Sequence, residues 1–384
     1  MRIALVTETY PPEINGVALT VRRAVEYLRE RGHAVEVIRP RQAGETAGPG
    51  AGEWLSFGWT IPMCPELRFG AARSATLERH FDTAPPDLVH VATEGPLGWA
   101  AVTAARRRSI PTTSDFRTSF HIYSHSYRLG WLAPAIAGYL RRFHNRTRRS
   151  FVPTAQGREA LLAAGFERVD VVGRGVDLER FAPARRDPGL RTRLAPTGGP
   201  VLLYVGRLAA EKNVALALRA YRRARRFAPQ AQMVVVGDGP LRATLERRFP
   251  EVQFVGSQTG DALAAHYASA DLFLFPSLTD TFGNVTLEAL ASGLPVVAFR
   301  VAAAAELVTD RLNGRLVPAG DDEAFMLAAS LLASLHPELD AMRLHARVAA
   351  CECDGDSVLQ RFERLLLEAA DAYRPAGTAA ACVA

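Results

Sequence analysis

Residues 276–299 read PSLTDTFGNVTLEALASGLPVVAF. The apolar run 272–275 precedes this stretch, its middle is rich in small and apolar residues that suit a helix, and it ends in a second apolar run, 295–299. Short apolar runs separated by a helix are typical of buried parallel strands. The stretch therefore predicts a strand, a helix and a second strand of an α/β sheet.

The same pattern extends through the rest of the chain. In the second half, strands are predicted at 201–206, 232–237 and 252–256, with a helix over 214–226. The first half has a strand at 2–7, a helix over 17–31 with Val17, Val21, Val25 and Leu28 on one face and Gly32 at its end, and further strands at 34–40, 87–92 and 110–113. Two α/β halves predict two doubly wound, Rossmann-like domains facing a cleft, with ligands at the carboxyl ends of the strands.

The predicted domains are 1–172, 173–355 and a C-terminal helix with its tail, 356–384. Hydrophobic residues make up 48% of the 384 residues and charged residues 22%, which excludes a disordered chain. Four cysteines in a chain of this length exclude a disulfide scaffold.

Two acids eight positions apart, Asp280 and Glu288, flank the Phe282-Gly283 turn, and Gly293-Leu-Pro-Val-Val follows. This passage resembles the signature of retaining glycosyltransferases of family 4, which have the GT-B fold. The resemblance implies a nucleotide diphosphate sugar as substrate, with the donor in the second domain and the acceptor in the first. It covers almost the whole chain, and implies that the C-terminal helix returns to the first domain.

The acid spacing suits such a donor. If a helix starts near Gly283, eight residues separate the carboxylates by roughly 12 Å, so one acid reaches the sugar hydroxyls and the other the ribose diol. The backbone N–H groups of Gly283, Asn284 and Val285 would face the diphosphate. In the alternative interpretation, Asp280 is a helix cap and Glu288 a surface acid.

A second constellation, VLLYVGRLAAEKN, spans residues 201–213. The resemblance assigns Arg207 and Lys212, which follow Gly206, to the donor diphosphate, where cations stabilise the charge of the leaving group. Lys212 is the single lysine among 46 basic residues, which favours a compact point charge there, although chance also explains it.

Other donor-side residues are weaker predictions. Gly237 and Asp238 follow a strand and suit a phosphate or base, or simply a tight turn. The resemblance places Val255 and Gly256 near the base. In the first half, it makes Gly16 a backbone donor near the diphosphate or the acceptor.

The acceptor side is predicted from SDFRTSFHIYSHSYRLGWL, residues 114–132. Relatives often read His-Thr-x-Phe-x-x-Tyr here, whereas this chain has Arg117 in place of the His and ends the motif at Tyr123. Either Arg117 or His121 therefore takes the role of the family's histidine beside the sugar. Glu94 and Gly95 belong to a predicted loop that lines the same cleft.

The charge is uneven. Residues 1–172 hold 22 Arg against 16 acids, residues 173–384 hold 24 basic residues against 24 acids, and residues 101–150 hold ten Arg and one acid, Asp115. This basic stretch predicts contact with an anionic membrane surface, or else a solvated face. Nucleic acid is excluded because no binding motif accompanies the charge.

No cofactor or metal is expected. Asp354-Gly-Asp356 directly precedes a helix and is interpreted as its cap, and Cys351 with Cys353 lacks a second pair for zinc. Without a leader pattern or an apolar membrane span, the protein is expected to be cytoplasmic, with a peripheral position on the inner face of the plasma membrane as a further expectation.

The function predicted by these features is transfer of a hexose, preferentially mannose from GDP-mannose, to a hydroxyl of a lipid or glycan acceptor with retention. Alternatives are a UDP-sugar-dependent synthase of sulfoquinovosyl or glucuronosyl diacylglycerol, a GT-B nucleotide-sugar epimerase or nicotinamide enzyme, and a two-lobed solute-binding protein.

Overall fold

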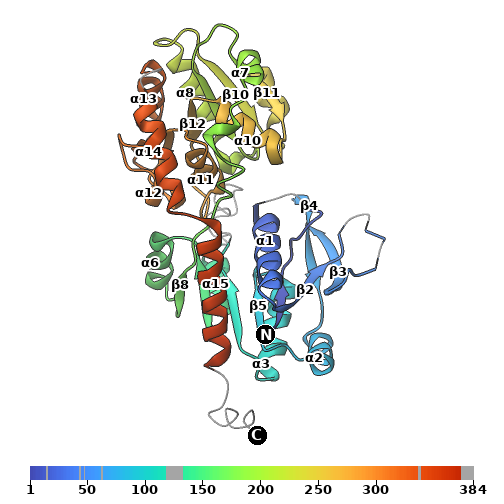
Figure 1. The fold of residues 1–384 in the computed structure, drawn as a ribbon. Helices are drawn as coiled ribbons and strands as arrows, with labels where there is room; N and C mark the ends of the chain where they lie inside the picture. Colours follow the sequence, from blue (N-terminus) through green and yellow to red (C-terminus); the bar gives the residue numbers. More distant parts are fainter. Residues whose placement is uncertain are drawn as a thin grey trace. The chain divides into compact units, whose positions relative to one another are not determined.

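The computed structural model describes residues 1–13, 16–42, 45–46, 48–61, 64–117, 133–335 and 339–372. These residues form two compact units, shown in Figure 1. The first unit contains 1–117, 133–173 and 359–372, and the second contains 174–358. Each unit is an α/β domain built on a sheet whose pairings are mainly parallel in the first unit and all parallel in the second, so the predicted fold class is confirmed.

The first unit is built around one eight-stranded sheet, in the order β4-β3-β2-β1-β5-β6-β7-β8. Its elements are β1 (Arg2–Val6), α1 (Gly16–Glu30), β2 (Ala34–Pro40), β3 (Glu53–Ile61), β4 (Cys64–Ala71), α2 (Ser74–Thr83), β5 (Leu88–Val91), α3 (Pro96–Arg107), β6 (Thr112–Asp115), α5 (Ala133–His144), β7 (Arg149–Val152), α6 (Ala155–Ala163) and β8 (Val169–Val171). The β3–β4 pairing is antiparallel and the other pairings are parallel.

Helix α1 shows how the apolar spacing forms this core. Its buried residues are Ala18, Val21, Ala24, Val25 and Leu28, which recur every three or four positions and so share one face. The helix is followed by Gly32, whose φ of +84° suits a glycine after a helix end. The predicted periodicity and the predicted stop are both confirmed.

The second unit contains a six-stranded sheet in the order β11-β10-β9-β12-β13-β14, with all pairings parallel. Its elements are the 3-10 turn Pro183–Arg185, α7 (Pro188–Leu194), β9 (Val201–Val205), the 3-10 turn Ala210–Lys212, α8 (Val214–Ala224), β10 (Gln232–Val236), α9 (Arg242–Arg248), β11 (Gln253–Gly256), α10 (Gly260–Ser269), β12 (Leu272–Phe275), α11 (Asn284–Ala291), β13 (Val296–Phe299), α12 (Ala302–Leu307), β14 (Gly314–Val317), α13 (Asp322–Ser334) and α14 (Asp340–Cys351).

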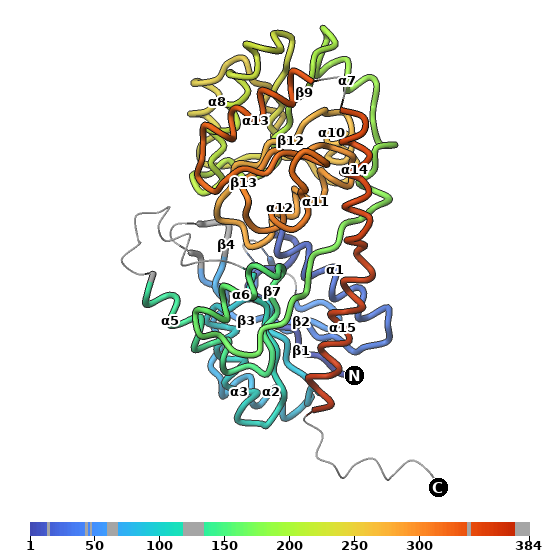
Figure 2. Tube along the Cα trace, turned by 90° about the vertical axis from the view of Figure 1, so that its left-hand side faces the viewer, coloured from blue at the N-terminus to red at the C-terminus, as the bar shows by residue number. Residues whose placement is uncertain are grey.

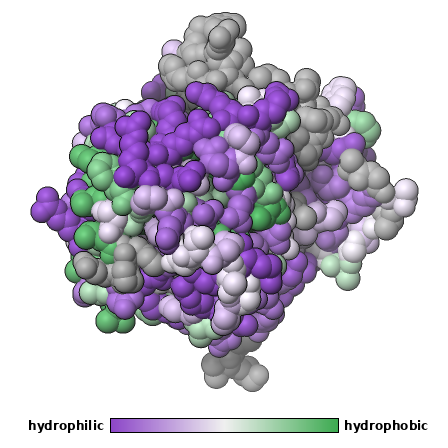
Figure 3. All heavy atoms as spheres, turned by 90° about the horizontal axis from the view of Figure 1, so that it is seen from above, coloured by the Kyte–Doolittle hydropathy of each residue, from purple (hydrophilic) through white to green (hydrophobic). Residues whose placement is uncertain are grey.

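Strands β9, β12 and β13 are buried along their whole length, as continuous apolar runs predict for a sheet covered on both faces. The Cα trace in Figure 2 follows these strands through the second unit. Hydrophobic side chains on the face shown in Figure 3 lie in separate patches among hydrophilic ones, which is ordinary for a folded domain.

The last helix, α15 (Gly355–Asp371), belongs to the first unit from Leu359 onward. Its buried Phe362 lies edge-on to His90 and Phe151, with ring centroids 5.0 and 5.8 Å away. The side chain of Glu363 accepts hydrogen bonds from this unit as well, one of them joining His33 Nε2 and Oε1 over 2.8 Å. The helix therefore completes the core of the first unit, as predicted.

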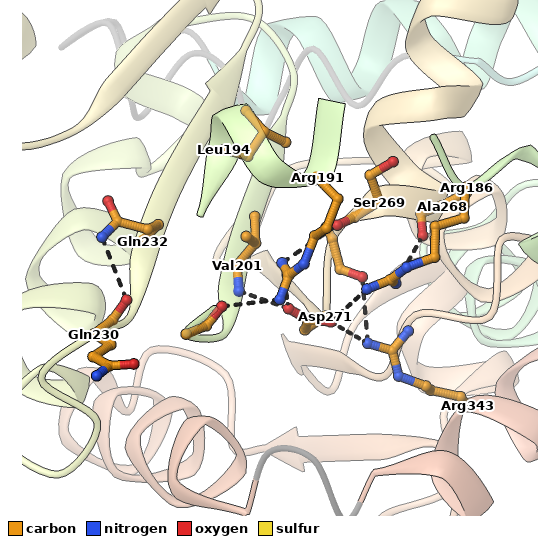
Figure 4. Close-up of polar contacts among 12 residues, drawn as sticks. Arg186, Arg191, Leu194, Val201, Gln230, Gln232, Ala268, Ser269, Asp271 and Arg343 are labelled. Carbon is orange, nitrogen blue, oxygen red and sulfur yellow. Dashed lines mark hydrogen bonds and ion pairs between the residues drawn. The ribbon is translucent and has the colours of Figure 1, made fainter. Parts of the chain in front are cut away.

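The amino edge of the second sheet is tied by a buried ion cluster, drawn in Figure 4. Asp271 is 1% exposed and precedes β12. It accepts a hydrogen bond from the N–H of Val201 over 2.8 Å and forms ion pairs with Arg191, over 2.7 Å, and Arg343. One carboxylate thus joins β9, α7 and α14.

Candidate active site

Three neighbouring strands of the second unit, β10, β9 and β12, end at the same edge of the sheet, so the loops after them meet. Gly206 follows β9 and Gly237 follows β10. Gly237 has a φ of +140°, and a Cβ added there would lie 2.0 Å from the carbonyl oxygen of Gly206. Only glycine permits this approach of two backbones. The close approach fixes the shape of the edge where the donor residues were predicted.

Lys212 and Asp280 come together at this edge. The Nζ of Lys212 lies 2.6 Å from Oδ1 of Asp280, and both side chains are mostly buried, with exposed fractions of 17% and 16%. Ser277 donates a short hydrogen bond to the other carboxylate oxygen. The hydroxyl of Thr279 donates to the carbonyl of Glu211 over 3.2 Å and links the two loops. Residues predicted separately, as a phosphate cation and a sugar acid, therefore form one ion pair.

The predicted helix start after Phe282 is confirmed, because α11 begins at Asn284. Gly283 precedes it with a φ of +87°, and no side chain caps the helix. A Cβ at Gly283 would lie 3.0 Å from the ring of Phe275. Val285, in the first turn, is partly buried against the core. The positive end of a helix is thus left without a side-chain cap at the edge that carries Lys212.

Glu288 lies one turn further along α11 and is partly buried. It accepts a hydrogen bond from the hydroxyl of Tyr267 over 2.9 Å. Burial raises the pKa of Glu288 to about 7, although the hydrogen bond from Tyr267 opposes this shift. The carboxyl group is therefore poised between its neutral and ionised forms near neutral pH.

Tyr204, on β9, supports the loop that carries Arg207. Its hydroxyl donates to the carbonyl oxygen of Arg207 over 3.2 Å. Burial raises the pKa of Tyr204 well above its usual value, and the charge of Asp280 adds to the shift. The phenol therefore stays neutral and keeps its proton for this hydrogen bond.

The remaining donor-side predictions lie in loops of the same sheet. Asp238 is exposed, and Arg242 is 2.8 Å from it. The pKa of Asp238 is lowered by the hydrogen bond from the N–H of Gly239 and, to a smaller extent, by the hydrogen bond from Arg242. Val255 is partly buried, and its carbonyl accepts from Gln258 Nε2 over 3.1 Å. These contacts place the residues without testing their role in donor binding.

In the first unit, Glu94 and Gly95 follow β5. The Glu94 side chain is 3% exposed, and its Oε1 has no hydrogen-bond partner among the described residues. Burial raises the pKa of Glu94 to about 8. Gly95 precedes α3, and a Cβ added to it would lie 2.2 Å from Oε1 of Glu8. The predicted loop therefore contains a buried carboxyl group with an unused oxygen.

Glu8, which follows β1, holds this loop in place. Its carboxylate accepts hydrogen bonds from the N–H groups of Gly70 and Leu97, the latter over 3.0 Å. Burial raises the pKa of Glu8 to about 7. Because β1 and β5 are neighbours in the sheet, Glu8 and Glu94 lie at the same carboxyl edge.

Arg117 lies at the root of the predicted acceptor segment, just after β6. Its Nε donates to Oδ2 of Asp115 over 2.6 Å, and both side chains are buried. His121 and Tyr123 lie outside the described residues. Gly16 is the first residue of α1 and is exposed, and its carbonyl accepts from the hydroxyl of Thr20 over 2.6 Å.

Several arginines of the basic stretch 101–150 have acidic partners in the fold. Arg107 and Arg108 pair with Glu78, over 2.8 and 3.2 Å, and Arg108 also pairs with Asp82. Arg117 pairs with Asp115, as above. The strong local charge of the linear sequence is therefore partly neutralised by α2.

Sequence reasoning missed several residues of both edges. These are Glu8, Asp115, Tyr204, Tyr267 and Ser277. The two tyrosines look like ordinary apolar-run residues, and only the fold brings their hydroxyl groups to the site. For Glu8 a usable signal exists, since an acid directly after the first predicted strand lies at a carboxyl edge.

Neither a metal-binding cluster nor a membrane-spanning helix is found among the described residues. No cluster of three or more His, Cys, Asp or Glu side chains suited to holding a metal ion occurs in the part of the chain that the structure describes. Within the same part, no helix has both the length and the apolar character needed to span a bilayer.

Comparison with known proteins identifies the family. Residues 199–334 match the family Glycosyl transferases group 1, and residues 14–180 match Glycosyltransferase Family 4. A GDP-mannose-dependent alpha-mannosyltransferase of Mycobacterium tuberculosis is 36% identical over 335 residues, which cover 84% of this chain and 85% of that protein. The sulfoquinovosyl transferase of Arabidopsis thaliana is 30% identical, over 82% of this chain and 62% of that protein.

Among solved structures, the sucrose-phosphate synthase of Thermosynechococcus elongatus superposes with a TM-score of 0.79 at 18% identity, over 97% of this chain and 99% of that one. At this identity the likeness concerns the fold. The sequence relatives carry the assignment further, since the match at 36% identity spans most of both chains. The chain is therefore a glycosyltransferase of family 4 with the GT-B fold.

Proposed function

We propose that this enzyme transfers mannose from GDP-mannose to a hydroxyl of a lipid or glycan acceptor, with retention of the anomeric configuration. The observation that carries the proposal is the Lys212–Asp280 ion pair at the carboxyl edge of the second unit. It joins a phosphate-binding cation to a sugar-binding acid. The GDP-mannose-dependent activity for which the mycobacterial relative is named supports the choice of donor.

In this mechanism, Arg207 and Lys212 hold the diphosphate and stabilise the charge that it gains as the sugar leaves. The N–H groups of Gly283, Asn284 and Val285 add the positive end of α11. Asp280 accepts hydrogen bonds from sugar hydroxyls and Glu288 from the ribose diol. Gly206, Gly237, Asp238, Val255, Gly256 and Phe282 line the donor.

The acceptor attacks the face of the sugar from which the phosphate departs, and the leaving phosphate oxygen takes the proton of the acceptor hydroxyl. No protein nucleophile is required. Metal is also not required, since Arg207 and Lys212 supply the positive charge. On the acceptor side we assign Gly16, Glu94, Gly95, Arg117 and Tyr123, with His121 or Arg117 beside the sugar.

A thermal-shift screen against GDP-, UDP- and ADP-sugars tests the donor. A donor present at 100 times its dissociation constant adds about 2.7 kcal/mol of stability. We expect the largest shift with GDP-mannose, and an unchanged melting temperature with all GDP compounds would reject the proposal. Proton NMR of the product with the matching donor then shows whether the anomeric configuration is retained.

A UDP-sugar-dependent glycolipid synthase is the second candidate, favoured by the identity to the sulfoquinovosyl transferase. The same screen separates the two, because the shift would then come from UDP-sugars. Release of a free epimerised sugar, without transfer, would indicate an epimerase instead.

We also propose reversible contact of the basic stretch 101–150 with the anionic inner face of the plasma membrane. Among its arginines, Arg106, Arg141, Arg142 and Arg146 have no acidic partner among the described residues. The pKa of Arg146 is lowered by desolvation first and then by the charges of Arg106 and Arg142, so these three cations lie near one another. Flotation with anionic vesicles at low and high salt tests this contact, and absence of binding at low salt rejects it.

A further inference from the structure

The end of strand β3 leaves the body of its sheet. β3 pairs with β2 as far as Ser56, which lies opposite Pro40. Beyond Ser56, β3 pairs with β4 in an antiparallel ladder that starts with Phe57 opposite Ala71. We call residues 57–61 and 64–71 the aromatic ribbon. A two-stranded ribbon is marginally stable by itself, so what its two faces contact decides its role.

The outer face of the ribbon consists of large aromatic rings. Trp59 lies directly opposite Phe69, and Phe57 lies two residues before Trp59, so all three side chains share one face. Phe57 is 68% exposed, Trp59 69% and Phe69 38%. The rings of Phe57 and Trp59 are in edge contact, with centroids 6.1 Å apart. The three rings therefore form a contiguous exposed apolar surface.

The opposite face of the ribbon has no room for such rings. Gly58 lies opposite Gly70 in the ladder. A Cβ added to Gly58 would lie 2.4 Å from the carbonyl oxygen of Arg41, and one added to Gly70 would lie 2.7 Å from Cδ2 of Leu97. The glycine face is therefore pressed against the unit. Because side chains alternate between faces, this contact forces the aromatic residues outward.

The charged side chains at the ribbon do not all lie on its aromatic face. Arg68, on β4, shares the glycine face, where its guanidinium donates to the carbonyl of Arg41 over 3.1 Å. Arg73 is exposed two residues after β4. The nearby acids Glu45 and Glu53 both accept hydrogen bonds from Arg39, over 2.7 and 2.9 Å. An exposed aromatic surface with the cation of Arg73 nearby in sequence suits an anionic lipid surface, where aromatic rings enter the interface and cations meet phosphate.

We propose that the aromatic face of this ribbon docks the first unit onto the surface of a bilayer that contains anionic lipid. The ribbon is linked through Gly70 to the carboxyl edge of the first sheet, which is the proposed acceptor side. The N–H of Gly70 donates to Glu8, which lies beside Gly95 at that edge. Docking would therefore bring that edge to membrane-bound acceptors. This last step rests on the proposed lipid acceptor, whereas docking itself does not.

Flotation with phosphatidylglycerol-containing vesicles tests the docking. The test variant is Phe57→Ser/Trp59→Ser, and the matched control is Phe227→Ser, which removes an equally exposed phenylalanine (64%) from the second unit. We expect the test variant to lose at least about tenfold in vesicle affinity, because each ring removed forfeits burial of a large apolar side chain. The control should bind like the wild type. Since the rings are exposed, the melting temperature of both variants should be unchanged.

Fluorescence gives a second measurement. The emission of Trp59 should shift to the blue on vesicle addition. This shift should be absent in Trp59→Phe, although that variant should still bind the vesicles. Full vesicle affinity of Phe57→Ser/Trp59→Ser would overturn the proposal and leave docking to the basic stretch alone. A variant that loses self-association in size exclusion while its vesicle affinity is unchanged would also overturn it and mark a protein interface.

The proposed donor and the proposed membrane docking can be rejected independently of each other. Thermal shifts with GDP-mannose should be equal in the wild type and in Phe57→Ser/Trp59→Ser, because the ribbon lies in the first unit and the donor residues in the second. A wild type that binds vesicles but no GDP compound would reject the proposed donor and leave the docking intact.

Discussion

Lys212 and Asp280, 68 residues apart in sequence, form an ion pair with 2.6 Å between Nζ and Oδ1. In the proposed donor site, this pair would hold each side chain in place before the donor arrives. Each partner also reduces the cost of burying the other's charge.

Lys212→Ala should lower turnover by about 10² or more, because a preorganised cation near a leaving group contributes on that scale. Lys212→Arg is the matched variant, since it keeps the charge but not the compact ammonium. We expect it to retain part of the activity. Steady-state kinetics of both variants and of Asp280→Asn provide the check, and near-normal turnover of Lys212→Ala would remove this lysine from the mechanism.

Donor affinity should depend on pH through Glu288. Its pKa is raised to about 7, and the ionised form is the better acceptor for two ribose hydroxyls. Affinity for GDP should therefore rise with pH up to about 7 and then level off, by up to about tenfold per pH unit. Calorimetry of the wild type and of Glu288→Gln, which cannot ionise, separates this effect from the titration of the phosphate. Equal pH profiles would contradict it.

Stability should fall as the pH rises. Glu8, Glu94 and Glu288 have pKa values raised from 4.5 to about 7, 8 and 7, so the folded protein binds more protons than the unfolded chain between these values. Their contribution is fully present below about pH 4.5 and is lost as the pH rises through 7 to 8. Urea unfolding should show Glu94→Gln gaining more than about 1 kcal/mol on the wild type between pH 5 and pH 8. A constant difference would refute the shift.

Asp271→Asn should destabilise the protein without a direct effect on chemistry. The substitution leaves Arg191 and Arg343 without their buried charge partner, a loss of about 3–5 kcal/mol for a buried pair. Thermal unfolding measures it. Glu323→Gln is a suitable control, because its ion pair with Arg223 lies on the surface, and we expect less than about 1 kcal/mol there.

Gly237→Ala should disrupt the packing of the two loops that follow β9 and β10. Its Cβ would lie 2.0 Å from the carbonyl of Gly206. Gly320→Ala is the control, since Gly320 also has a positive φ, +80°, but nothing lies within 4 Å of the added atom. The control should cost about 1–2 kcal/mol from backbone conformation alone. The test variant should cost more and weaken GDP binding, and equal costs would mean that the loop yields without strain.

The fold is well predicted because the two signals used, continuous apolar runs for strands and glycines at helix ends, are both local in the sequence. Apolar runs such as 201–205 become fully buried strands, and Gly283 does precede a helix. The pairing of Lys212 with Asp280 was not predictable, since it depends on two loops that meet only at the sheet edge. The aromatic ribbon also escaped prediction, because a strand with glycines on one face and rings on the other reverses the usual alternation of a soluble sheet.

For the basic stretch 101–150, the sequence overestimates a property instead of missing one. Its linear count exaggerates the surface charge, because Glu78 and Asp82 lie far from it in sequence and beside Arg107 and Arg108 in space. Composition gives totals, whereas neutralisation depends on which helices are neighbours.

The return of α15 to the first unit has a consequence for synthesis. Phe362 fills the space beside His90 and Phe151, yet the ribosome makes it after the whole second unit. The amino-terminal sheet must therefore wait, with part of its core open, until residues 359–372 emerge. The second unit can thus finish folding before the first. During synthesis, the incompletely folded first unit would expose apolar core surface for longer, and chaperones would bind there.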